Sequence, residues 1–339
     1  MKFTHTYILL LFFTTCINAQ SSHNIHLCSN WNPGYTFNDI WGYETGGNEY
    51  AIIGSLSKIS IVDVTNPYNV SLVGEVAPGL SSTWRDIKSY GNYIYGVSEA
   101  NGEGLVVIST LGFDLDFVNI TYQSNTEFDR AHNLFIDEAK GRLYVVGGRK
   151  GFTSKNIIVY DIASNPANPI HIATSNLTGG YVHDVYVRDN IAYCSHGNFG
   201  FGIYDMNNPA SPIELATQTT NGYNHSSWLS TNGDYAFICE EVPASLPILT
   251  MDLTDISNGI EVVASFKEPI LAPGHTNNRP HNPFVVGNLL YVSYYQDGVV
   301  VFDISNPTSP FRVAFYDTSN NVDYMGYIKH IQTHQELLK

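Results

Sequence analysis

Polar pairs that contain a histidine or a carboxylate recur along this chain. Four of the pairs join a histidine to a small polar or acidic residue, namely His132-Asn133, His183-Asp184, His225-Ser226 and His281-Asn282. Two further segments carry Asp39 and Asp86 at the equivalent place. Imidazole nitrogens and carboxylate oxygens can bind zinc, iron or copper, or act as general acids and bases. Whether they do so here depends on whether the fold gathers the pairs.

The pairs mark the start of a repeat. Their second members are spaced by 47, 47, 51, 42 and 56 residues: Asp39, Asp86, Asn133, Asp184, Ser226 and Asn282. Each pair opens an apolar run, a turn and a second run, as in "VHDVYVRDNIAYCSHG". A second signature follows in "ISIVDVTNP", "IIVYDIASNP", "FGIYDMNNP" and "VVVFDISNP", and then another short strand. Short β-branched runs between turns predict strands, and a period of about 40–50 residues indicates propeller blades.

The sequence therefore predicts an all-β fold, a β-propeller of four-stranded blades over residues 20–318 with six visible repeats. The tail 319–339 does not continue the pattern, and "NIHLCSNW" resembles an outer strand without inner partners. We expect a seven-blade type that lacks most of its last blade. A closed six-blade ring with a spare strand is the alternative, and it would avoid exposed strand edges.

Aspartates of the second signature recur without implying catalysis. They are Asp63, Asp161, Asp205 and Asp303, and Ser109 takes their place in the second repeat. An aspartate ahead of Ser/Thr-Asn-Pro accepts backbone N–H bonds and stabilises the turn. Serine can replace it in that role, so we interpret these positions as structural.

The first strand of each propeller blade lines the central channel, so the polar pairs should surround one mouth. The loop between the second and third strands returns to the same face and adds further groups. The candidate residues at this mouth are Asp39, Asp86, Glu99, His132, Asn133, His183, Asp184, His196, His225, Glu240, His281 and Asn282. Glu241 lies in the same loop as Glu240, and His275 is an additional ligand candidate.

Three interpretations of this mouth remain open. In the first, the pairs serve only to hydrogen-bond neighbouring blades and channel water. Alternatively, a divalent metal ion binds to the histidines His132, His183, His225 and His281. In the third interpretation, the mouth recognises a glycan, peptide or protein. His225-Ser226 does not predict a nucleophile and its base, because adjacent strand residues point to opposite faces.

Charge and composition restrict the partners. The chain has 339 residues, is 43% hydrophobic and carries a net charge of −15. Nucleic acids and anionic membranes bind basic surfaces, so neither is an expected partner. Cys28, Cys194 and Cys239 remain after the leader, an odd number without a CxxC motif, which argues against a disulfide scaffold or a cysteine zinc site.

The N-terminus has the features of a secretory signal. Lys2 precedes the apolar stretch "YILLLFFTTCI", and "INA" offers a cleavage site after residue 19. We expect a signal peptide over residues 1–19 and a secreted or cell-surface protein. No second apolar stretch reaches the roughly 20 residues of a spanning helix, so no transmembrane segment is expected in the mature chain.

The second signature resembles LVIVD repeats. "STWRDIKSYGNYIYGVSEA", "AHNLFID" and "YNHSSW" are similar to segments of the choice-of-anchor B family of exported bacterial proteins, and the likeness covers roughly residues 25 to 318. The resemblance implies a secreted or surface-displayed propeller and brings no assigned reaction. We expect a binding scaffold that acts through the channel mouth. The alternative is a metal-dependent hydrolase or oxidoreductase that uses the histidines and aspartates.

Overall fold

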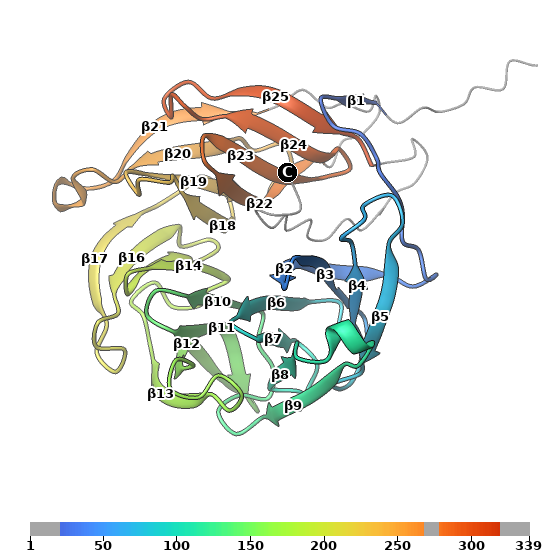
Figure 1. Cartoon of the computed structure of the whole chain (residues 1–339). Helices are drawn as coiled ribbons and strands as arrows, with labels where there is room; N and C mark the ends of the chain where they lie inside the picture. The colour runs from blue at the N-terminus through green and yellow to red at the C-terminus, as the bar shows by residue number, and fades with distance from the viewer. Residues whose placement is uncertain (1–20, 268–277, 319–339) are drawn as a thin grey trace, which may run out of the picture.

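The computed structural model describes residues 21–267 and 278–318, and these form six antiparallel sheets around a ring (Figure 1). Within these ranges the helical elements are two single 3-10 turns, η1 (Phe113–Leu115) and η2 (Ile256–Asn258). No helix in the described part of the chain is long and apolar enough to cross a membrane. The predicted all-β propeller with six four-stranded blades is confirmed.

Each blade consists of four strands that are consecutive in the chain, and the first strand lies innermost. The strands of the first three blades are β2 (Phe37–Thr45), β3 (Asn48–Ser55), β4 (Ile59–Asp63), β5 (Ser71–Val76), β6 (Arg85–Tyr90), β7 (Tyr93–Ser98), β8 (Leu105–Ser109), β9 (Asn119–Ser124), β10 (Asn133–Asp137), β11 (Arg142–Lys150), β12 (Thr153–Asp161) and β13 (Ile170–Ser175).

The strands of the last three blades are β14 (Asp184–Arg188), β15 (Ile191–Ser195), β16 (Phe201–Asp205), β17 (Ile213–Gln218), β18 (Asn224–Leu229), β19 (Tyr235–Glu240), β20 (Ile248–Asp252), β21 (Glu261–Phe266), β22 (Arg279–Val286), β23 (Leu289–Tyr295), β24 (Gly298–Asp303) and β25 (Phe311–Tyr316). Every blade begins at or beside one of the polar pairs, so the repeat seen in the sequence corresponds to the structural repeat.

The inner strands follow one another around the channel. In order, β2, β6, β10, β14, β18 and β22 each contact the next. The sixth and first blades meet through the rings of Phe284 and Trp41, whose centroids are 6.3 Å apart. Between the blades lie apolar clusters, such as Ile52 and Ile59 of the first blade against Ile87 of the second. Burial of these aliphatic faces is the main force that holds the ring together.

One extra strand extends the sixth blade. β1 (Ser22–His23) pairs antiparallel with β25 and makes that sheet five-stranded. Residues 24–31, the stretch expected to be the outer strand of a seventh blade, form no strand, so this expectation is wrong. The tail 319–339 and the predicted signal peptide are outside the described residues.

The recurring aspartates stabilise turns, as predicted. Asp63, Asp205 and Asp303 each accept a hydrogen bond from the backbone N–H two residues later, at 2.7–2.8 Å. In the second blade the Ser109 hydroxyl accepts the equivalent bond from the Leu111 N–H at 3.3 Å. The substitution of serine for aspartate is tolerated because one side-chain oxygen is all that the turn requires.

A buried ion pair lies within the second blade, and its arginine also bonds to the first blade. Arg85 on β6 pairs with Glu103 through its two terminal guanidinium nitrogens, and both side chains are fully buried. The Arg85 Nε–H also donates to the Ser55 carbonyl of the first blade at 3.3 Å. The geometry is bidentate, which is the strongest arrangement for an arginine and a carboxylate.

We predict that Glu103→Ala destabilises the protein by about 3–5 kcal/mol, because it leaves a buried guanidinium without its counter-charge. Urea denaturation would measure this as a lowered unfolding midpoint. The control is Lys140→Ala, which removes an exposed pair with Asp189 at 3.4 Å and should cost under about 1 kcal/mol. Equal losses of stability in the two variants would contradict the conclusion that the buried Arg85–Glu103 pair stabilises the fold more than an exposed ion pair does.

Candidate functional site

The inner strands present two tiers of side chains to the channel. The polar tier is the set of second pair members Asp39, Asp86, Asn133, Asp184, Ser226 and Asn282. The aromatic tier, two residues further along each strand, is Trp41, Lys88, Phe135, Tyr186, Trp228 and Phe284. Alternate residues of a strand face the same side, and members of both tiers line one narrow cavity. The channel lining is therefore polar near the start of the inner strands and mostly aromatic two residues further along them.

Above the polar tier, the four histidines form an arc across the third to sixth blades. The ring centroids of His132 and His183 are 4.2 Å apart, those of His183 and His225 4.4 Å, and those of His225 and His281 3.8 Å. Tyr295 stacks on His281 at 4.8 Å and ends the arc. We call these four residues the histidine arc. The sequence placed them at one mouth, and the structure brings them side by side.

Two β-bulges help to turn the histidines toward the channel. The strand register shifts between Asn224 and Ser226 in β18, and between Pro280 and Asn282 in β22. A bulge lets consecutive side chains share one side of a strand. His225 Nδ1 and Ser226 Oγ accordingly both donate to the His281 carbonyl oxygen. The expectation that these neighbours point to opposite faces is wrong here for this reason.

The polar pairs connect blade to blade. His183 Nδ1 donates to the His225 carbonyl, and His225 Nδ1 donates to the His281 carbonyl, both at 3.1 Å. In the polar tier the Leu134 N–H donates to Asp86 Oδ2 at 2.8 Å. Asn133 Nδ2 donates to Asp184 Oδ2 at 2.9 Å. The structural role considered for the pairs is thus present at several blade junctions.

These bonds determine the histidine tautomers. A carbonyl oxygen only accepts, so His183 and His225 carry their proton on Nδ1, and the Nε2 lone pair is left as an acceptor or metal ligand. Burial lowers the pKa of His225 to about 4, so its ring is neutral near pH 7. At the other end of the arc, His132 Nδ1 lies 2.7 Å from Glu99 Oε1, and this contact lowers the pKa of Glu99.

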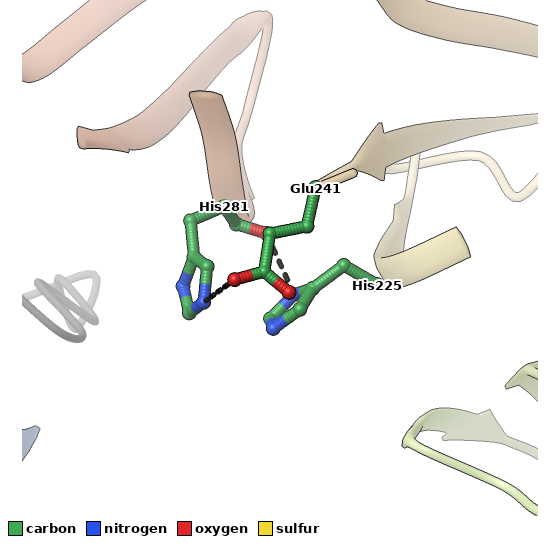
Figure 2. A group of neighbouring side chains, drawn as sticks. All are labelled: His225, Glu241 and His281. Carbon is green, nitrogen blue, oxygen red and sulfur yellow. Dashed lines mark hydrogen bonds and ion pairs between the residues drawn. The ribbon is translucent and has the colours of Figure 1, made fainter. Parts of the chain in front are cut away.

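One group of side chains brings three ligand atoms together. Among the described residues, His225, Glu241 and His281 place one nitrogen or carboxylate oxygen each within 4.8 Å of one another. Figure 2 shows the two imidazoles and the carboxylate facing the same small space. His281 Nε2 is 3.9 Å from Glu241 Oε1, to which the Tyr295 hydroxyl donates at 2.8 Å.

Glu241, rather than the expected Glu240, faces the histidines. Glu240 is the last residue of β19, and its buried carboxylate accepts the Gly222 N–H at 2.8 Å. Glu241 follows it and points the other way, as successive residues of an extended chain do. In the sequence, the only sign of this carboxylate is the Glu240-Glu241 dipeptide at the end of the second strand. Because successive residues of an extended chain point to opposite sides, only one of the two can face the histidines.

His196 also differs from its expected place. Its Nδ1 donates to the Tyr181 carbonyl at 2.9 Å, and its Nε2 accepts from the Tyr204 hydroxyl at 3.0 Å. Burial lowers its pKa, so it is a neutral ring hydrogen-bonded within the fourth blade. The additional candidate His275 lies outside the described residues. Cys194 and Cys239 are buried free thiols.

Carboxylates of the polar tier are electrostatically crowded. Lys88 Nζ donates to Asp86 Oδ1 at 2.7 Å and lies 4.7 Å from the centre of the Trp41 ring. Burial and the charge of Asp86 raise the pKa of Asp39 well above its usual value. The same two causes raise the pKa of Asp184 to about 7. The charge of Lys88 is thus shared by three aspartates, and protonation of Asp39 or Asp184 reduces the excess negative charge.

Comparison with known proteins agrees with this architecture. The LVIVD repeat family matches residues 179–220 and 284–318, which include parts of the fourth and sixth blades. The chain contains LVIVD repeats. No curated protein sequence matches it.

Solved structures share the fold at low sequence identity. A functionally unknown protein from Desulfotomaculum acetoxidans superposes with a TM-score of 0.63 at 14% identity, over 85% of this chain and 87% of that one. A protein from Lactobacillus plantarum gives a TM-score of 0.60 at 15% identity, over 83% and 82%. Identities this low establish the propeller fold alone.

We predict that Asp184→Asn changes how stability depends on pH. With its pKa raised to about 7, Asp184 keeps its proton in the folded protein at pH values where the unfolded chain releases it. Between about pH 4 and 7 its contribution to the unfolding free energy therefore falls as pH rises, by at most about 1.4 kcal/mol per pH unit. The side chain borders the channel, and water reduces this amount.

The asparagine variant should show a flatter profile and be more stable than wild type at pH 8 by about 1–2 kcal/mol. Urea denaturation at several pH values measures both effects. Asp189→Asn is the control, since the Asp189 side chain is 67% exposed. Parallel profiles for wild type and Asp184→Asn would show that Asp184 titrates normally.

Proposed function

We propose that this protein is an exported binding propeller that captures a ligand at the channel mouth that carries the histidine arc. The observation that supports this most is the collection of imidazole, guanidinium, carboxylate and phenol groups that several blades contribute there. A cavity beside the arc is lined by Glu99, Arg130, Gly147, Arg149 and Tyr181. Convergent polar groups beside aromatic rings are typical of ligand sites.

The charges at this cavity favour an acidic ligand. The chain has 16 Lys and Arg against 31 Asp and Glu, yet two arginines lie together at this mouth. Guanidinium groups bind carboxylates in a bidentate manner. Tyr181 and Trp84 are 38% and 42% exposed, and their rings can pack on a sugar face. We therefore propose a carboxylate-bearing oligosaccharide as the ligand, with an acidic peptide as the other outcome of the test.

Export and choice-of-anchor B membership belong to the same proposal. The N-terminal Lys2 with its apolar stretch supports secretion. The LVIVD repeats and the segments "AHNLFID" and "YNHSSW" support the family. A glycan-binding role suits a protein displayed outside the cell.

A metal-dependent hydrolase or oxidoreductase is the second candidate function. It is favoured by the group of His225, Glu241 and His281. Such an enzyme needs a bound metal ion before it needs a substrate, so a metal-binding measurement tests its first requirement.

Binding to immobilised oligosaccharides, measured in EDTA, tests the proposed function. We expect a uronate- or sialate-bearing oligosaccharide to bind at least about tenfold more tightly than its neutral counterpart, because a charge-assisted hydrogen bond contributes about 1.5–3 kcal/mol. Arg149→Ala should remove most of this preference, since Arg149 is exposed at the cavity. The same measurement with acidic peptides detects the alternative ligand.

Lys140→Ala is the matched control, because it removes a positive charge from the turn that precedes the opposite end of β11. It should leave binding unchanged. Equal binding of acidic and neutral ligands, or equal effects of Arg149→Ala and Lys140→Ala, would contradict the proposal.

A further inference from the structure

We infer that His225, Glu241 and His281 form a binding site for one divalent transition-metal ion, zinc in particular. The inference goes beyond the proposed oligosaccharide binding and does not depend on it. Two imidazoles and one carboxylate are a donor set that zinc accepts, and three protein ligands leave one position open. The three ligand atoms already lie within 4.8 Å of one another.

The ligands come from two adjacent blades that are bonded to each other. His225 stands at the bulge of β18, Glu241 directly follows β19 of the same blade, and His281 stands at the bulge of β22. The His225–His281 bond connects these blades at 3.1 Å. Each ligand therefore lies in a β-strand or directly next to one, and a hydrogen bond joins the two blades at the site.

Neighbouring groups orient the ligands. The Nδ1–H of His225 donates to a backbone carbonyl, which directs its Nε2 lone pair away from that contact (Figure 2). The Tyr295 hydroxyl holds the Glu241 carboxylate, and the Tyr295 ring stacks on His281. Metal-ligating histidines commonly donate their other N–H to a carbonyl, and such contacts increase metal affinity.

The distances require only small side-chain movements. Zinc lies about 2.0–2.2 Å from nitrogen and oxygen ligands, so two ligands of a tetrahedron are about 3.3 Å apart. His281 Nε2 and Glu241 Oε1 are 3.9 Å apart, and no pair in the group exceeds 4.8 Å. Side-chain rotations that shift the ligand atoms by a fraction of an ångström to about 1.5 Å therefore bring all three within bonding distance of one zinc ion.

The surroundings of the ligands also suit a cation. His225 and His281 are each 3% exposed, so the surrounding medium has a low dielectric constant and strengthens the attraction between the cation and Glu241.

The other two histidines of the arc are not ligands in this arrangement. His132 is bonded to Glu99 at the far end of the arc. His183 uses Nδ1 for the His225 carbonyl, and it does not belong to the three-residue group. The inference therefore replaces the four-histidine site expected from the sequence with a two-histidine, one-carboxylate site, and the difference can be measured.

The test is a titration of the full, metal-stripped protein with Zn²⁺, followed by calorimetry and by elemental analysis after gel filtration. We expect one zinc per chain and a raised melting temperature, since the ion binds the folded state. Glu241→Gln should weaken binding at least about tenfold while its amide oxygen still accepts the Tyr295 bond. His225→Ala and His281→Ala should abolish stoichiometric binding.

His132→Ala is the matched control, because it removes an imidazole from the same arc without removing a proposed ligand. It should change affinity by less than about twofold. Absence of stoichiometric zinc from the wild type would overturn the inference. So would equal losses in His132→Ala and Glu241→Gln, or weak binding that no variant changes, which would indicate an adventitious ion only.

Melting curves of the metal-free variants show whether each one folds, and Glu241→Gln keeps the test decisive if a histidine variant does not. The oligosaccharide measurement is made in EDTA, so it is independent of the zinc result. Failure of one proposal therefore leaves the other standing.

Discussion

Propeller blades meet along their inner strands, and in this protein hydrogen bonds from the polar pairs cross several of those junctions. His183 donates to the carbonyl of His225, and His225 donates to the carbonyl of His281. Asp86 accepts the N–H of Leu134 from the next blade. Each of these bonds satisfies a backbone group near the channel, where the packing of aliphatic side chains between the sheets gives way to polar surroundings. The rest of the mouth depends on this arrangement, because it decides where the remaining nitrogens and oxygens point.

The same bonds make the mouth chemically useful. A histidine that donates through Nδ1 to a backbone carbonyl presents Nε2 in a defined direction and stays neutral when buried. His196 shows the contrast, since its Nε2 accepts the Tyr204 hydroxyl and both nitrogens are used within the fold. Below the arc, the polar tier concentrates carboxylates around Lys88, and the aromatic tier narrows the channel with Phe135, Trp228 and Phe284. A ligand therefore approaches the arc from the mouth that carries it.

The sequence predicted the ring well because a repeat of 42–56 residues and its turn aspartates are local signals. It also predicted that the histidines gather, since equivalent positions of successive blades share a face. It did not predict the bulges that turn His225 and Ser226 to the same carbonyl, because a register shift depends on the pairing strand. Nor could it separate Glu241 from Glu240 without knowing where β19 ends, or show that Tyr204 binds His196.

Blade-to-blade bonds to backbone carbonyls fix His183 and His225 in the Nδ1–H tautomer, which makes Nε2 the acceptor atom of each ring. Long-range proton–nitrogen correlation spectra of the metal-free, ¹⁵N-labelled protein at pH 7 test this directly, with single histidine variants to assign the signals. We expect His183 and His225 to show a protonated Nδ1 and an unprotonated Nε2. An Nε2–H tautomer or a doubly protonated ring at either residue would contradict the account.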